Sequence, residues 1–234
     1  MIEFGTPQFW VAGLEIIVIN ILLSGDNAVV IALACRNLAP AQRKMGIFWG
    51  VVGAVVLRVV LTFFAVQLLL LPYLQLIGAA LLLWIGVKLI AEDEGEGHDI
   101  AASDRLVAAV KTIIIADLVM SIDNVIGVAG AAKGSLTLLI FGLVVSIPLV
   151  VLGSQLIMKL IERMPWLVIA GGGLLGYIAG EIATTDVVDK EWINTHAAWL
   201  HIAAPIAGAL FVVAVGMWLT RRQQQSRQAN ATHP

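Results

Sequence analysis

The chain has 234 residues, of which 60% are hydrophobic and only 13% charged, with a formal net charge of −2. Soluble domains carry about 25% charged residues, so this composition excludes an ordinary soluble domain and indicates a polytopic membrane protein. The charge balance gives no sign of a nucleic-acid partner, and a single cysteine, Cys35, excludes an internal disulfide.

The first apolar run follows the segment MIEFGTPQFW, which lacks the basic region and the small-residue cleavage site of a secretory signal peptide. The run itself contains Glu15, Asn20 and Asp26, which a signal peptide would not carry. We therefore expect the first span to remain in the mature protein.

Membrane-spanning helices need about 20 predominantly apolar residues each. By that criterion the chain contains seven spans, near 9–33, 44–70, 73–91, 106–131, 135–160, 166–183 and 199–219. Polar segments separate them, including an acidic loop at 92–104 and a polar loop at 184–198. The sequence predicts an all-α membrane protein that forms one membrane domain over 1–234 in a lipid bilayer.

Basic residues predict the orientation, because they favour the cytoplasmic side of a membrane. With the loop 34–43 placed in the cytoplasm, Lys133 and Lys190 fall outside and Arg58 falls within the membrane, which leaves eleven of the 14 basic residues on the cytoplasmic side. We therefore expect the N-terminus outside and the C-terminus, with the tail 220–234, in the cytoplasm.

The polar pair of the first span recurs later in the chain. LLSGDNAVVIA at 22–32 matches LVMSIDNVIGVA at 118–129 with an offset of 97, which aligns Ser24, Asp26 and Asn27 with Ser121, Asp123 and Asn124. The match continues in the next helix at an offset of 92 (47–52 with 139–144) and in the third at an offset of 93 (72–93 with 165–186).

Two repeats of three helices each, 9–93 and 105–186, follow from these matches. An odd number of helices means that the second repeat enters the membrane from the opposite side, so the repeats are inverted. Inverted repeats with polar groups near the midplane are typical of secondary transporters that work by alternating access. The seventh helix lies outside the repeat and is expected to serve packing or homodimer formation.

Carboxylates inside a span are expensive, because each ionised Asp at the bilayer centre costs roughly 2.5–3.5 kcal/mol on insertion scales. Asp26 and Asp123 therefore need a compensating positive charge, which a bound cation would supply. Carboxylate, amide and hydroxyl oxygens suit hard divalent cations such as Mg²⁺, Ca²⁺ or Mn²⁺. The alternative is that the polar groups only join the first and fourth helices by hydrogen bonds.

Regular helices would place Asn20, Ser24 and Asn27 on one face of the first span, and Asp117, Ser121 and Asn124 on the matching face of the fourth. Glu15 returns almost to the azimuth of Asp26. The repeat therefore extends to a row of oxygen-bearing side chains.

Arg58 lies near the middle of the second span and needs a carboxylate partner there. Glu15 and an Asp of the candidate site are both eligible, the latter when the metal has left. Pairing with a site Asp would stabilise the empty carrier, whereas the alternative is a purely structural ion pair.

A glycine series and two groups of acidic residues stand apart from the candidate site. Gly172, Gly176 and Gly180 at four-residue spacing predict close helix packing. The acidic residues outside the spans, at 92–104 and in the outer loop at Asp186 and Asp189, would suit cation capture and release, or form ordinary solvated loops.

The segments LLSGDNAVVIALA and ADLVMSIDNVIGVAGAA together resemble the TerC family of integral membrane proteins, in particular its short YjbE-type members, over about residues 9–186. This resemblance implies a seven-helix exporter of metal ions, manganese above all, in the bacterial cytoplasmic (inner) membrane. It implies as metal ligands Asp26, Asn27, Asp123 and Asn124, with Asp117 as a further acidic member. The chain departs from close relatives at Asn20, where they often have Asp.

The prediction is a divalent cation exporter, with Mn²⁺ as the transported substrate and other divalent cations as alternatives, and with accessory roles for Glu15, Asn20, Ser24, Ser121 and Arg58. Export of an amino acid or another small solute is a second hypothesis, suggested by the wider LysE-type superfamily. A third is a membrane partner that works with the secretion machinery to metallate or insert exported proteins. No phosphate-binding Gly-rich loop appears, and we expect no enzyme activity.

Overall fold

The structure is a computed structural model and describes residues 10–11, 14, 25–91, 102–132 and 136–231. These ranges contain eight helices: α2 (Gly25–Cys35), α3 (Pro40–Leu69), α4 (Leu74–Ala91), α5 (Ala102–Ala132), α6 (Leu136–Arg163), α7 (Trp166–Ala183), α8 (Lys190–His196) and α9 (Leu200–Ala231). No strand occurs in the described ranges, and the predicted all-α class is confirmed.

Five helices contain segments long and apolar enough to cross a membrane, namely Pro40–Phe63, Leu74–Ala91, Ile140–Arg163, Trp166–Ala183 and Leu200–Gln225. They coincide with five of the seven predicted spans. α2 coincides with the end of the first predicted span, but its 11 described residues measure only about 17 Å. α5 has the length for the fourth span, but Arg105, Lys111 and Asp117 interrupt the apolar run in its described part.

Helix bounds follow local sequence signals where these are strong. α3 begins at Pro40, whose fixed φ suits the first turn of a helix. α6 ends two residues before Pro165, and α7 begins directly after it. The predicted span 166–183 therefore coincides with α7.

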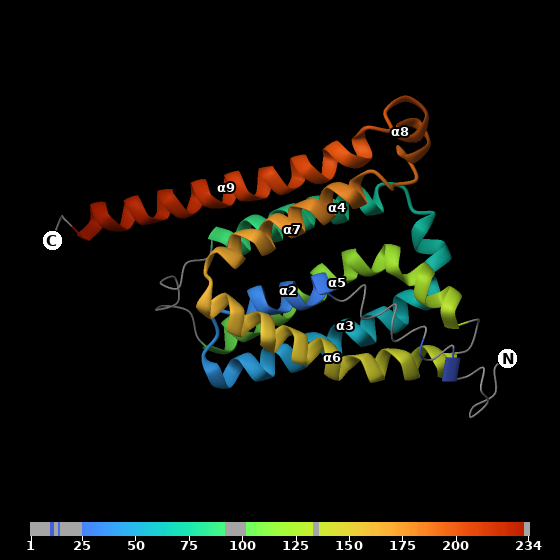
Figure 1. Ribbon diagram of the computed structural model, residues 1–234, viewed down its shortest axis with the longest axis horizontal. Helices are drawn as coiled ribbons and strands as arrows, with labels where there is room; N and C mark the ends of the chain where they lie inside the picture. The colour runs from blue at the N-terminus through green and yellow to red at the C-terminus, as the bar shows by residue number, and fades with distance from the viewer. Residues whose placement is uncertain (1–9, 12–13, 15–24, 92–101, 133–135, 232–234) are drawn as a thin grey trace.

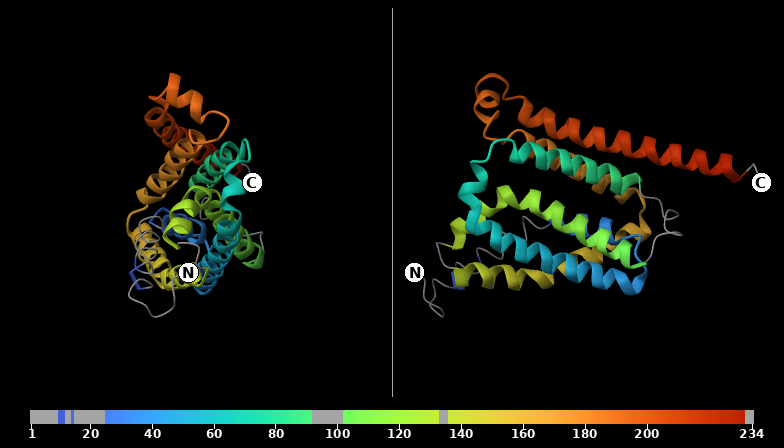
Figure 2. Two further views of the ribbon diagram at one scale, coloured as in Figure 1. Left: turned by 90° about the vertical axis from the view of Figure 1, so that its right-hand side faces the viewer. Right: turned by 180° about the vertical axis from the view of Figure 1, so that it is seen from behind.

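The helices form two groups that lie side by side along the long axis of the molecule (Figure 1). α4, α7 and α9 pack on one another in the upper group, and α2, α3, α5 and α6 form the lower group. Contacts of α4 with α5 and of α2 with α7 join the two groups. The views from the side and from behind show the same division (Figure 2).

Glycines allow the close approach at both junctions between the groups. A Cβ at Gly78 of α4 would lie 2.7 Å from a methyl group of Val119 in α5, and a Cβ at Gly171 of α7 would lie 2.8 Å from a methyl group of Leu33 in α2. Real Cβ atoms essentially never approach so closely, so the two junctions need these glycines. The continuous apolar core runs through both, with Leu82 and Leu175 among its fully buried members.

Candidate functional site

A buried ion pair ties α3 to α5 in the lower group. Arg58 of α3 donates a hydrogen bond from Nη2 to Oδ1 of Asp117 in α5 over 2.6 Å. Its Nε donates to Oγ of Ser121 at 3.0 Å, and that hydroxyl donates in turn to Oδ2 of Asp117 at 3.1 Å. Arg58 and Asp117 are each only 5% exposed, so both charges lie away from solvent.

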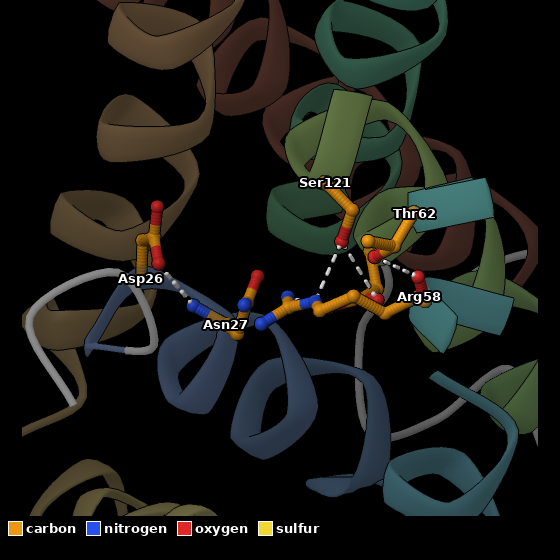
Figure 3. A network of polar contacts seen from close by, with 6 residues as sticks. Asp26, Asn27, Arg58, Thr62 and Ser121 are labelled. Carbon is orange, nitrogen blue, oxygen red and sulfur yellow. Dashed lines mark hydrogen bonds and ion pairs between the residues drawn. The ribbon is translucent and has the colours of Figure 1, made fainter. Parts of the chain in front are cut away.

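The three side chains meet because of helical spacing and an apolar environment. Asp117 and Ser121 are four residues apart on α5 and therefore share one face of that helix. Arg58 projects from the adjacent helix, α3, onto this face (Figure 3). The guanidinium donates from two of its nitrogens to two different oxygen acceptors. The single ammonium group of a Lys could not donate with the same geometry.

Asn27 of α2 faces the ion pair from a third helix. Its side chain is buried and points toward the Arg58 guanidinium (Figure 3). The preceding residue, Asp26, is partly buried and lies on the far side of Asn27 from Arg58, with its Oδ1 accepting the backbone N–H of Asn27 at 2.8 Å. The two residues therefore point in different directions, as a helical turn of about 100° per residue requires.

A small cavity lies between α2, α3 and α5, next to this cluster. Its polar lining comes from Asn27 and Asp117, and its apolar lining from Val30, Ile31, Ala54 and Ile113. An amide side chain and a carboxylate thus border the same space from two helices. Oxygen atoms of these types are the ones that hard divalent cations prefer in proteins.

The apolar lining was not predicted from the sequence, although a signal for it exists. Val30 and Ile31 lie one turn after Asn27, Ala54 lies one turn before Arg58, and Ile113 lies one turn before Asp117. Searching one helical turn from each polar candidate would have found all four. They form an apolar wall on one side of the polar cluster.

Of the ten predicted site residues, the structure brings four together at the cluster and its cavity, namely Asn27, Arg58, Asp117 and Ser121, whereas Asp26 lies beside Asn27 and points elsewhere. Asp123 and Asn124 lie on α5, in the stretch for which side chains are not described. Glu15, Asn20 and Ser24 lie outside the described residues. Among the described side chains, no group of three or more His, Cys, Asp or Glu residues is close enough to hold a metal ion.

Arg58 was predicted to need a carboxylate, with Glu15 and a site Asp as the eligible partners. The structure pairs it with Asp117, which is a site Asp. Asp117 also has the predicted i, i+4 relation to Ser121, now seen as a hydrogen bond.

Comparison with known proteins gives consistent matches over nearly the whole chain. The family model described as "Integral membrane protein TerC family" matches residues 5–224. The uncharacterized membrane protein YjbE of Bacillus subtilis is 40% identical over 211 residues, which cover 90% of this chain and 96% of YjbE. No solved structure matches the chain.

More distant similarity extends to two further bacterial membrane proteins. The uncharacterized membrane protein YceF of Bacillus subtilis is 27% identical over 96% of this chain and 88% of its own length. The UPF0053 inner membrane protein YgdQ of Escherichia coli is 25% identical over 68% of this chain and 74% of its own length.

Proposed function

Because the chain belongs to the TerC family of integral membrane proteins, we propose that it transports divalent metal cations, and that its physiological activity is manganese efflux across the bacterial cytoplasmic membrane. The observation that carries this proposal is the meeting of α2, α3 and α5 at one buried polar cluster, where Asn27 and Asp117 border the same cavity. Oxygen ligands of these kinds suit Mn²⁺ and other hard cations.

The charge of the cluster supports a divalent cargo. Arg58 cancels the charge of Asp117 through their ion pair. The S-x-D-N motifs contribute Asp26 and Asp123, whose two negative charges the sequence predicts at the same site. A divalent cation would neutralise them, whereas charges left uncompensated inside a membrane are strongly unfavourable.

Reciprocal features of the two halves support inverted repeats. Gly78 of α4 packs against α5, while its counterpart Gly171 of α7, at the repeat offset of 93, packs against α2. Thr62 in α3 and Ser154 in α6, at the offset of 92, each donate a hydrogen bond to the carbonyl four residues earlier, both at 2.7 Å. We therefore propose seven helices in two inverted units and alternating access around the site between them.

Transport assays on purified protein test the proposal. Reconstituted into liposomes, the chain should move Mn²⁺, with Mg²⁺, Ca²⁺, Fe²⁺ and Zn²⁺ compared side by side and with and without a pH gradient. Asp26→Asn and Asp123→Asn should each lower the rate at least about tenfold, the factor that corresponds to 1.4 kcal/mol.

The matched control is Asp104→Asn, which removes an exposed carboxylate at the start of α5. It should leave transport within about twofold of the parent rate, because Asp104 is exposed and solvent screens its charge. Equal losses in all three variants would contradict the assignment of the site. Absence of transport for every metal tested would favour amino-acid export or a role beside the secretion machinery.

A further inference from the structure

The ion pair between α3 of the first repeat and α5 of the second has no charged counterpart at the repeat-related positions. At the offset of 92 that aligns the second helix of each repeat, Arg58 corresponds to Val150 of α6. At the offset of 97 that aligns the S-x-D-N helices, Asp117 corresponds to Asn20. The pair Arg58 and Asp117 thus takes one residue from each repeat, and the repeat-related pair, Val150 and Asn20, is neutral.

Both charged residues of the ion pair are replaced by neutral residues at the repeat-related positions. The two pairs of positions therefore carry the same net charge of zero. The sequence itself places neutral residues, Val150 and Asn20, at the repeat-related positions. Replacing buried ion pairs by neutral groups is often neutral or stabilising for folding. Stability alone therefore does not explain why Arg58 and Asp117 are charged.

The position of the pair gives it a consequence for an empty carrier. Asp117 borders the cavity together with Asn27, so a cation bound there would compete with Arg58 for the same carboxylate. Ser121 accepts a separate hydrogen bond from Nε of Arg58, which would keep the guanidinium beside the site after Asp117 turns to the metal. When the metal leaves, Arg58 would be in place to pair with Asp117 again.

We propose that Arg58 is an internal counter-cation that replaces the transported metal on Asp117, and so allows the empty carrier to return across its transport cycle. The proposal rests on the proposed metal transport. With Arg58 in place, the charge of Asp117 in the empty site is neutralised; without Arg58, Asp117 would add an uncompensated negative charge. Because the charge penalty opposes reorientation of the empty site, Arg58 governs net transport and is dispensable for metal-for-metal exchange.

Two flux measurements on the full chain in liposomes separate these steps. Net flux is the uptake of radioactive Mn²⁺ into metal-free liposomes, and exchange is its uptake into liposomes preloaded with unlabelled Mn²⁺. In Arg58→Gln, net flux should fall at least tenfold while exchange stays within about threefold of the parent. Mn²⁺ should also bind about tenfold more tightly, because the competing positive charge is gone.

The double variant Arg58→Val with Asp117→Asn copies the neutral residues at the repeat-related positions, Val150 and Asn20, and serves as the charge-balanced control. Its absolute rates should fall because a ligand is lost, but its ratio of net flux to exchange should return to within about threefold of the parent. Arg58→Lys, which keeps the charge, should likewise retain most of that ratio.

Parallel losses of net flux and exchange in Arg58→Gln, or an unchanged ratio, would overturn the proposal, since a purely structural ion pair would affect both fluxes alike. If Arg58→Gln does not fold, the double variant carries the test, and a ratio at least tenfold below that of the parent would overturn the proposal. A parent protein that moves no metal in either format would instead overturn the transport function itself.

Discussion

Asp186, in the segment between α7 and α8, holds the beginning of α4. Its buried carboxylate accepts backbone N–H bonds from Tyr73 and Gln75 at 3.1 Å each, from Leu76 at 3.4 Å and from Val188 at 3.0 Å. Tyr73 has a φ of 65°, a left-handed conformation that is unfavourable for a bulky residue. The carboxylate thus stabilises both a helix N-terminus, where negative charge is favoured, and a strained turn before it.

We expect Asp186→Asn to lower the free energy of unfolding by about 1–3 kcal/mol at pH 7, because it removes a charged acceptor from buried donors. Burial by itself would raise the pKa of Asp186, but the backbone N–H bonds outweigh burial and hold the pKa below its ordinary value. The charged carboxylate therefore stabilises the fold above about pH 4, and this contribution is lost as the pH falls through the lowered pKa. Thermal unfolding at a series of pH values should show the difference shrinking below about pH 4.

Asp189→Asn provides the control within the same segment. Burial and the neighbouring charge of Asp186 raise the pKa of Asp189, so its ionised form opposes folding near neutral pH. Its removal should leave the unfolding temperature unchanged or raise it. Similar losses in both variants would contradict a specific role for the Asp186 carboxylate.

The sequence predicted which side chains need a partner of opposite charge. It did not predict which residue is that partner. An Arg inside a span demands a carboxylate, so the need of Arg58 for one was predictable. The pairing with Asp117 depends on how α3 packs against α5, which the helical periodicity of the sequence does not predict. In the same way Asp186 was predicted as part of an outer acidic loop, whereas its contacts come from residues more than 100 positions earlier.

Glycines on α7 determine how closely this helix approaches α9. A Cβ at Gly176 would collide with the carbonyl oxygen of Gly208, and a Cβ at Gly180 would collide with that of Ala204. Gly172 faces α4 instead, with its Cβ position 2.5 Å from the Ile90 side chain. The predicted role of the glycine series in close helix packing is confirmed, and the series contacts two different helices.

Gly180→Ala should therefore destabilise the protein by about 1–3 kcal/mol, because the added methyl group meets backbone atoms that cannot rotate away. Its counterpart is Gly153→Ala in α6, where the new Cβ would lie 3.7 Å from the Cβ of Ala28, an ordinary contact. That variant should be neutral or stabilising by up to about 1 kcal/mol through helix propensity. Thermal unfolding of the two variants measures both effects, and equal destabilisation would contradict the packing argument.

The end of a helix was predictable from hydropathy only where the helix and its apolar segment end at the same place. The seventh span was predicted to stop at 219, but α9 continues to Ala231. Arg and Gln dominate this extension, and both are good helix formers although they are poor membrane residues. The Arg222 guanidinium also lies 4.1 Å from the ring centre of Trp218, one turn earlier. Hydropathy predicts what crosses a membrane, whereas propensity determines how far a helix extends.

The two helix groups differ in their packing and in the location of the candidate site. α4, α7 and α9 pack through small residues, and the candidate site lies in the group of α2, α3, α5 and α6. The sequence repeat predicted the pairing of α2 with α5 through their S-x-D-N motifs. It did not predict the grouping, because α9 lies outside the repeat and no repeat match indicates that it packs on α7 and α4.

One end of the bundle gathers most of the basic residues. α2, α4 and α6 end there, α3 and α5 begin there, and α9 ends on the same side (Figures 1 and 2). The basic side chains at these helix ends include Arg36, Arg43, Lys44, Lys88, Arg105, Lys159, Arg163, Arg221 and Arg222. α8 and Asp186 lie at the opposite end. By the positive-inside rule, we expect the basic end to face the cytoplasm.

Cysteine labelling in intact cells tests this orientation with few changes to the chain. Cys35 is the only cysteine and is buried, so Cys35→Ala gives a background without reactive thiols. Val188→Cys, exposed at the α8 end, should react with a membrane-impermeant maleimide added outside the cells. Gln225→Cys, exposed near the end of α9, should react only after the membrane is permeabilised. The reverse pattern would place the basic end outside, and labelling of both sites in intact cells would contradict a single orientation in the membrane.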